Sequence, residues 1–254
     1  MNNNHRQEIY WEKAISQSRH AINKGSLIPL KTIILEKEFI KFKDFEIRKL
    51  ETKFPKKYFK QNTLQNPFSP WDNNLEIAKI LSNHVLILNK FPVELGHLLL
   101  ITKNYQSQEA WLSKSDFNAL TIVEQDTSGL WFFNSSRIAG ASQPHRHIQL
   151  LRRANKVYCP RNEWFINNII NSKEVKNVHS KYGYAVLSRN DIKYKNKENQ
   201  LYMMYIDLIS LCNIGNLNEN TKPTKPYNLI ITPEWFALII RTKEKYKGFN
   251  INGL

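Results

Sequence analysis

The stretch "FFNSSRIAGASQPHRHIQLL", residues 132–151, decides how this chain is interpreted. It starts with aromatic residues, continues through small polar residues, and ends where polar and apolar side chains alternate. If residues 145–150 are extended, a period of two places His145, His147 and Gln149 on one face of a strand. The opposite face then receives the residues between and after them, Arg146, Ile148 and Leu150.

Three polar side chains on one face of a strand need a reason, because buried imidazoles and amides without partners are costly. One interpretation is a set of structural histidines whose hydrogen bonds are satisfied. A second is metal ligation, since alternating histidines on a strand are common ligand pairs. However, Gln149 is a poor zinc ligand, and no nearby Asp, Glu or Cys supplies a further donor. We therefore predict no protein-bound metal.

A third interpretation makes one imidazole a nucleophile toward phosphorus. Such an imidazole needs its other ring nitrogen held as a donor, usually by a backbone carbonyl, so that the attacking nitrogen keeps its lone pair. It also needs hydrogen-bond donors around the phosphate oxygens. Glycine would let the backbone approach a phosphate closely. The loop before the histidines offers candidate donors, namely Asn134, Ser135, Ser142, Gln143 and the backbone amides of Gly140 and Ala141.

Composition restricts the class of protein. The chain of 254 residues is 41% hydrophobic, which is typical of a folded globular protein. It has no apolar run long enough for a membrane span, its N-terminus lacks the apolar stretch of a secretory signal, and its two cysteines form no paired motif. We therefore expect a cytoplasmic protein without membrane contact. The net charge of +15 fits binding of polyanions, but biased codon usage explains it equally well, and no motif for binding a nucleic-acid polymer accompanies it.

The order of predicted elements indicates an α+β fold with a mostly antiparallel sheet flanked by helices. Helices are predicted over residues 6–24, 113–125, 161–171 and 198–214, the second opening with a capping box of Ser113 and Asp116. Strands are predicted over residues 39–50, 84–103 (two strands and a turn), 129–135, 147–152, 227–232 and 235–241. We expect one domain over residues 1–254, with an N-terminal part (1–60), a catalytic core (61–155) and a C-terminal part (156–254).

The motif at residues 140–151, "GASQPHRHIQLL", resembles the nucleotidyltransferase branch of the histidine triad superfamily. It is most similar to the diadenosine tetraphosphate phosphorylases, also called ATP adenylyltransferases. "NPFSPWD" (66–72), "HVLILNKFPVELGHLLLITK" (84–103) and "YNLIITPEW" (227–235) resemble the same family in the same order. Galactose-1-phosphate uridylyltransferases are the competing family, but they typically carry proline between the histidines and often a zinc site with paired cysteines. The resemblance implies a histidine-triad-like fold.

The resemblance also assigns roles to residues. His147 would be the nucleophile that forms an adenylyl-histidine, Gln149 would contact its phosphate, and His145 would orient the site or face the phosphate. His97, in the "GH" strand, is expected to have a packing role. The other residues expected to bind substrate are Lys56, Asn89, Lys90, Asn134, Ser135, Gly140, Ala141, Ser142, Gln143 and Asn228. A solvated surface charge is the alternative interpretation for both lysines.

The activity implied by the resemblance is the reversible cleavage of diadenosine tetraphosphate by inorganic phosphate into ATP and ADP. No cofactor is expected on the protein, although a divalent cation such as Mg²⁺ would accompany the nucleotide. The alternatives are uridylyl transfer between sugar phosphates and a non-catalytic regulator that binds dinucleotides. The chain departs from the family in having Ile240 before Arg241, where the family has proline, and in stopping at Leu254, so its C-terminus is either natively short or missing. The oligomeric state is unknown from the sequence.

Overall fold

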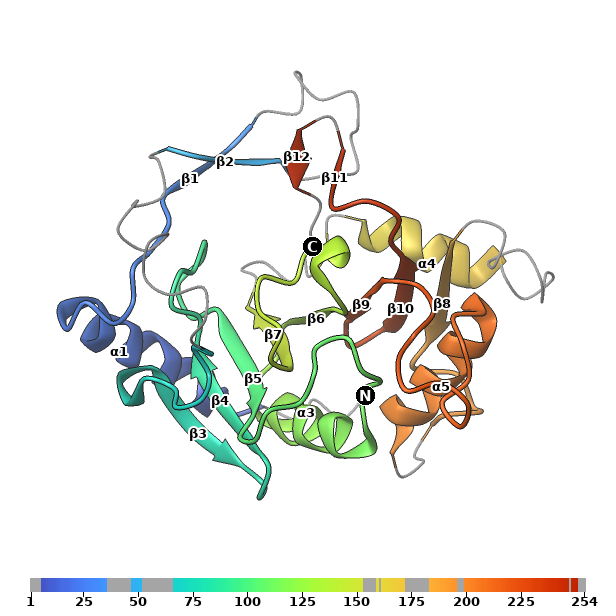
Figure 1. The fold of residues 1–254 in the computed structure, drawn as a ribbon, viewed down its shortest axis with the longest axis horizontal. Helices are drawn as coiled ribbons and strands as arrows, with labels where there is room; N and C mark the ends of the chain where they lie inside the picture. The colour runs from blue at the N-terminus through green and yellow to red at the C-terminus, as the bar shows by residue number, and fades with distance from the viewer. Residues whose placement is uncertain are drawn as a thin grey trace.

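The structure is a computed structural model, and it describes residues 6–35, 47–51, 66–152, 159, 161–171, 183–195, 199–246 and 248–250. Within these ranges, runs of strands are separated by single helices in an α+β arrangement (Figure 1). The predicted fold class, a mostly antiparallel sheet flanked by helices, is confirmed.

Eight strands form one sheet in the order β3-β4-β5-β7-β6-β9-β10-β8, and every neighbouring pair is antiparallel (Figure 1). Their bounds are β3 (Glu76–Ile80), β4 (His84–Leu88), β5 (Leu98–Thr102), β6 (Leu130–Asn134), β7 (His147–Leu151), β8 (Tyr184–Ser188), β9 (Tyr227–Ile231) and β10 (Trp235–Ile240). The predicted catalytic core supplies β3 to β7, and the predicted C-terminal part supplies β8 to β10. The division of the chain at residues 60 and 155 stays a prediction.

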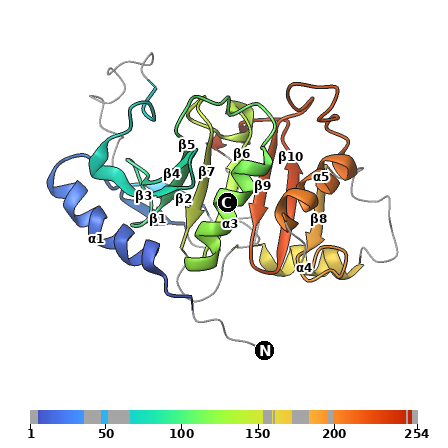
Figure 2. The same cartoon turned by 90° about the horizontal axis from the view of Figure 1, so that it is seen from below.

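The helices cover the two faces of this sheet unequally. They are α1 (Ile9–Asn23), α3 (Lys114–Asp126), α4 (Asn162–Asn171) and α5 (Gln200–Cys212). Figure 1 shows α3 and α5 below the sheet and α4 above it, and Figure 2 shows the face that α3 and α5 cover. Helix α4 packs against β8 and β10 at one end of the upper face. In the described part of the chain, the central strands β5, β7 and β6 therefore have no helix over their upper face.

Strand alternation explains this arrangement, because successive residues of a strand face opposite sides. On the lower side, Trp131, Phe133, Ile148 and Leu150 belong to the large core cluster that also contains Phe117 of α3 and Leu208 of α5. On the upper side, a smaller cluster joins Phe165 of α4 to strand residues Leu130, Val186, Ile230, Trp235 and Ala237. In β4, β5, β6 and β9 the residues on both faces are mostly apolar, and every residue of these strands is buried.

Short elements complete the described chain. They are β1 (Thr32–Ile34) paired with β2 (Arg48–Leu50), β11 (Lys245–Tyr246) paired with β12 (Phe249–Asn250), and the 3-10 turns η2 (Asn73–Leu75) and η3 (Arg137–Ala139). The four predicted helices are all present, and the capping box of Ser113 and Asp116 forms as expected. Neither β3 nor β8 was predicted from the sequence. Most of the predicted 39–50 strand lies outside the described residues, and only β2 represents it.

Candidate active site

The polar face predicted for the His-x-His-x-Gln motif exists in the structure. Strand β7 begins at His147, and the residue pairing of Leu99 with Gln149 and Ile101 with His147 fixes its register against β5. His145 lies just before the strand and forms an isolated β-bridge with Ser107. The ring of Phe68 lies 5.6 Å from that of His145 and 5.5 Å from that of His147, between centroids. Within β7, His147 and Gln149 alternate with Ile148 and Leu150 of the core under α3 and α5, so His147 lies on the face of the sheet that these helices do not cover.

The His147 ring has the arrangement that a nucleophilic imidazole requires. Its Nδ1 lies 2.8 Å from the carbonyl oxygen of His145. A carbonyl can only accept, so Nδ1 carries the proton and Nε2 keeps its lone pair. Nε2 forms no hydrogen bond with any described residue. Burial, together with a smaller contribution from the charge of neighbouring His145, lowers the pKa of His147 to about 4. The ring is therefore neutral at physiological pH.

Both ring nitrogens of His145 are bonded to protein groups. Nε2 lies 2.8 Å from the carbonyl oxygen of Thr102, so it is the donor. Nδ1 then accepts from the side-chain amide of Asn66 at 2.8 Å. The Asn66 amide is itself oriented, because its oxygen accepts from the backbone N–H of Phe68. Of the two roles expected for His145, the structure agrees with orienting the site and leaves no ring nitrogen for a phosphate.

Gln149 is oriented by a chain of hydrogen bonds that starts at a backbone amide. The Phe91 N–H donates to Asn89 Oδ1, so Asn89 Nδ2 donates to His97 Nδ1 at 3.1 Å. His97 Nε2 then donates to Gln149 Oε1, also at 3.1 Å. As a result, the NH₂ group of Gln149 is directed away from His97 and remains a donor. His97 thus does more than pack, which corrects the role expected from the sequence. Asn89 contacts His97 rather than projecting freely from its turn.

The loop between β6 and β7 differs from expectation in its backbone amides. The N–H groups of Gly140 and Ala141 donate to the carbonyls of Arg137 and Ser136, both at 2.9 Å, and are not available to a phosphate. Gly140 does adopt a left-handed conformation, with φ of 99°, that favours glycine. The side chains of Ser142 and Gln143 are exposed and half-buried, and they bond to no described residue. Among the loop residues predicted to bind phosphate, the side chains of Ser142 and Gln143 can therefore still donate to a ligand, whereas the Gly140 and Ala141 amides cannot.

Asn134 and Asn228 brace this loop from below. Asn228 Nδ2 donates to Asn134 Oδ1 at 2.6 Å and to the Ala139 carbonyl at 2.7 Å, and its Oδ1 accepts from Arg241. Ser135 Oγ accepts from the Tyr227 N–H at 2.8 Å. Of these residues, Asn134, Ser135 and Asn228 were predicted from the sequence to bind substrate, and their described hydrogen bonds are to protein groups. They position the loop.

The lysines predicted to bind substrate are less informative. Lys90 is half-buried in the connection between β4 and β5, where its Nζ lies 5.8 Å from the Phe91 ring centroid. Lys56 lies outside the described residues. Substrate binding by these two lysines stays a prediction.

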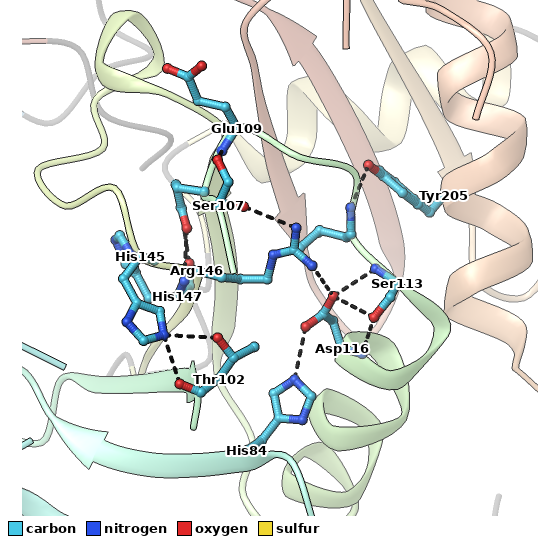
Figure 3. Close-up of polar contacts among 12 residues, drawn as sticks. His84, Thr102, Ser107, Glu109, Ser113, Asp116, His145, Arg146, His147 and Tyr205 are labelled. Carbon is cyan, nitrogen blue, oxygen red and sulfur yellow. Dashed lines mark hydrogen bonds and ion pairs between the residues drawn. The ribbon is translucent and has the colours of Figure 1, made fainter. Parts of the chain in front are cut away.

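A buried ion pair supports β7 from the opposite face (Figure 3). Arg146 Nη1 lies 2.9 Å from Asp116 Oδ2, and His84 Nε2 lies 2.9 Å from Asp116 Oδ1. Arg146 also donates to the Ser107 carbonyl. Burial alone would raise the pKa of Asp116, but the His84 hydrogen bond and the Arg146 charge outweigh it and hold that pKa below its usual value. The ion pair fastens the residue between the two histidines to the start of α3.

Comparison with known proteins decides the family. The model of the Ap4A phosphorylase N-terminal domain matches residues 1–166, and that of the ATP adenylyltransferase C-terminal domain matches residues 176–254. The chain belongs to the Ap4A phosphorylase family. Two transferase families were considered from the sequence, and the match is to the diadenosine tetraphosphate phosphorylases rather than the galactose-1-phosphate uridylyltransferases.

Two relatives of this family come from Saccharomyces cerevisiae. Protein APA1 is 32% identical over 188 residues, which cover 66% of this chain and 58% of the relative. Diadenosine 5',5'''-P1,P4-tetraphosphate phosphorylase 2 is 27% identical over 204 residues, covering 71% and 62%. The matched part of the chain thus spans about three fifths of each relative's length.

Solved structures of yeast Ap4A phosphorylase Apa2 share the fold. The crystal structure of Apa2 superposes with a TM-score of 0.68 and 22% identity, covering 96% of this chain and 86% of that chain. The structure of Apa2 in complex with Ap4A gives a TM-score of 0.67 at 22% identity, covering 95% and 84%. The predicted histidine-triad-like fold is confirmed.

Other features of this family member lie away from the histidines. The described residues contain no group of three or more His, Cys, Asp or Glu side chains placed to hold a metal ion. Among the same residues, no helix is long and apolar enough to cross a membrane.

A cavity of about 570 Å³ lies under α4, on the same face of the sheet as His147, and none of the predicted site residues lines it. Its lining residues are Arg161, Trp164, Phe165, Asn168, Tyr184 and Ile239.

Two buried histidines predict how stability depends on pH. Burial lowers the pKa of both His97 and His147 to about 4, from an ordinary value of 6.5. The unfolded chain therefore binds more protons than the folded protein between these values, so stability is full above pH 6.5 and falls as the pH drops toward 4. We expect the free energy of unfolding to fall by roughly 3–5 kcal/mol between pH 7 and 4.5.

Urea unfolding at a series of pH values measures this change. Replacing His97 by Gln removes one titrating group and should flatten the curve. Replacing Gln200, which does not titrate, by Met should leave the slope unchanged. An equal slope in the His97→Gln variant and the parent protein would contradict the assignment.

Proposed function

We propose that this protein cleaves diadenosine tetraphosphate with inorganic phosphate, producing ATP and ADP through an adenylyl group carried on His147. The observation that supports this most is the His147 ring, whose Nδ1–H is fixed on the His145 carbonyl while Nε2 keeps its lone pair. One relative, diadenosine 5',5'''-P1,P4-tetraphosphate phosphorylase 2, is named for this activity. A neutral imidazole with one nitrogen committed as a donor is suited to attack on phosphorus.

The reaction divides into two displacements at the same phosphorus atom. In the first, His147 Nε2 bonds to the α-phosphorus, and the bond from that phosphorus to the bridging oxygen breaks, so ATP leaves. In the second, an oxygen of inorganic phosphate bonds to the phosphorus and the P–N bond breaks, which gives ADP and restores the imidazole. The proton stays on Nδ1 and keeps its hydrogen bond to the His145 carbonyl throughout, so the positive charge that develops on the ring is next to an acceptor.

Donors around the phosphorus stabilise the charge on its nonbridging oxygens. Gln149 presents its NH₂ group, because His97 occupies its oxygen. Ser142 and Gln143 are two accessible polar side chains of the loop. A divalent cation would arrive bound to the polyphosphate, and the high positive charge of the chain favours so anionic a substrate.

The test is a product assay with and without phosphate. Without phosphate, enzyme and diadenosine tetraphosphate should release one ATP per active site and then stop. With phosphate, ATP and ADP should accumulate in equal amounts over many turnovers. Tight binding without release of ATP would instead indicate a dinucleotide-binding regulator, and turnover of UDP-glucose would indicate a uridylyltransferase.

Replacement of Gln149 by Glu isolates the donor role of its amide. The carboxylate can still accept from His97 but presents oxygen where the wild type presents N–H. Because removing one preorganised donor costs about 10²- to 10³-fold in rate, we expect ATP release in a single turnover to slow by that factor. Gln200→Glu is the matched control, since Gln200 lies on α5 and bonds to the Arg189 carbonyl. An unchanged rate in Gln149→Glu would show that the amide does not contact the reacting phosphate.

A further inference from the structure

The pairing between strands β6 and β7 stops before it reaches His147, the proposed nucleophile. Strands β6 and β7 pair from Leu130 with Leu151 to Phe132 with Gln149. The same antiparallel register would place Asn134 opposite His147, yet these two residues do not pair with each other. The strands have therefore separated at the position that carries His147.

The side chain of Gln108 fills this gap. Its Nε2 donates to the Asn134 carbonyl at 2.7 Å and to the His147 carbonyl at 3.2 Å. Its Oε1 accepts from the His147 N–H at 2.8 Å. The amide thus contacts both backbone polar groups of His147 and replaces the backbone hydrogen bonds that β6 and β7 would otherwise form at this position. Only 1% of Gln108 is exposed, so water cannot readily substitute for it.

Gln108 is itself held in a fixed place. Its backbone N–H donates to the Pro144 carbonyl, and the Arg146 N–H donates to the Gln106 carbonyl, both at 2.8 Å. The Arg146 guanidinium binds the Ser107 carbonyl at 3.0 Å (Figure 3). Residues 106–108 therefore run beside residues 144–146 as a short brace that ends in the Gln108 amide.

We propose that Gln108 is a positioning residue that fixes the nucleophile by holding the backbone of His147 apart from Asn134. The His147 ring is tied to the His145 carbonyl, so the direction of Nε2 depends on where the backbone of residues 145–147 lies. Loss of the brace would let β7 move toward β6 and turn the ring away from an in-line approach. A shift of about 1 Å in a reacting group costs about 100-fold in rate.

The experiment compares Gln108→Met, which keeps the length of the side chain but none of its three bonds, with Gln200→Met. Gln200 also bonds to a backbone carbonyl but lies on α5. We expect single-turnover release of ATP to slow about 100-fold in Gln108→Met, while the Kd for a methylene-bridged diadenosine tetraphosphate stays within about threefold of the parent value. Gln200→Met should match the parent in both. A rate equal to that of Gln200→Met, or a loss of affinity as large as the loss of rate, would overturn the proposal.

The kinetic part rests on the proposed function, so a second measurement is independent of turnover. Hydrogen exchange at the His147 amide should accelerate at least about tenfold in Gln108→Met and not in Gln200→Met, because Gln108 is the acceptor of that N–H. Unchanged exchange would refute the brace whatever reaction the protein catalyses. If wild type releases no ATP but His147 exchange responds as expected, the proposed function fails and the brace stands.

Should Gln108→Met not fold, Gln108→Glu provides the same test. The ionised carboxylate can accept from the His147 N–H but repels the carbonyls of His147 and Asn134, whereas the protonated form offers one donor. ATP release should therefore rise, relative to wild type, as the pH falls from 8 to 5.5. A constant ratio across this range would contradict the proposal.

Discussion

Replacing His147 by Ala should abolish phosphorolysis, with a fall in turnover on the order of 10⁵-fold, the scale seen when an enzyme loses its nucleophile. No other described imidazole can take over. His145 has both ring nitrogens bonded to protein groups, and His97 is held between Asn89 and Gln149. The measurement is the rate of ATP and ADP formation from diadenosine tetraphosphate at saturating phosphate.

His20→Ala is the matched control, because His20 is exposed in the last turn of α1. It should keep the parent rate. Binding of the methylene-bridged analogue should survive in His147→Ala, since the alanine removes the attacking group and leaves the loop of residues 135–144 in place. Turnover of His147→Ala within tenfold of the parent would contradict the assignment of the nucleophile.

Replacing Asp116 by Ala should produce the largest loss of stability. Arg146 is 4% exposed, and Asp116 is its carboxylate partner in the core (Figure 3). Removing one partner of a buried pair leaves an uncompensated charge and costs about 3–5 kcal/mol. The variant also loses the capping box at the start of α3. We expect the free energy of unfolding to fall by about 4 kcal/mol and Tm by roughly 10 °C.

Thermal unfolding of Asp116→Ala beside Glu109→Ala provides the comparison. Glu109 pairs with Lys222 at 3.4 Å on the surface, where both side chains are more than half exposed. Such a pair contributes about 0–1 kcal/mol, so the control should unfold near the parent temperature. Equal Tm values for the two variants would mean that the buried ion pair does not stabilise β7.

Local patterns in the sequence were sufficient for much of this fold. Alternation of polar and apolar residues predicted that His147 and Gln149 share one face of β7. The contacts of Phe68 with His147 and of His97 with Gln149 agree with this prediction. The capping box at Ser113 located the start of α3. In contrast, β8 was missed because "YAVLS" is short and lies between polar segments, so only its pairing with β10 identifies it as a strand.

The parts of the site that could not be predicted depend on contacts between distant residues. Gln108 lies 39 positions before His147, and no period or motif in the sequence joins them. The same holds for Asn66 and His145, although Asn66 begins a segment that resembles the family. The small residues of the loop suggested that Gly140 and Ala141 offer amides to a phosphate, but their N–H groups donate to the carbonyls of Arg137 and Ser136. Local hydrogen bonding of this kind is not visible in a sequence.

The most direct measurement is the location of the adenylyl group on the protein. Enzyme incubated without phosphate with substrate labelled at the α-phosphate should carry one acid-labile label, and peptide mapping at alkaline pH should place it on His147. Added phosphate should transfer that label to ADP. Label on another residue, or ATP and ADP formed with no protein-bound label at any time, would contradict the covalent mechanism.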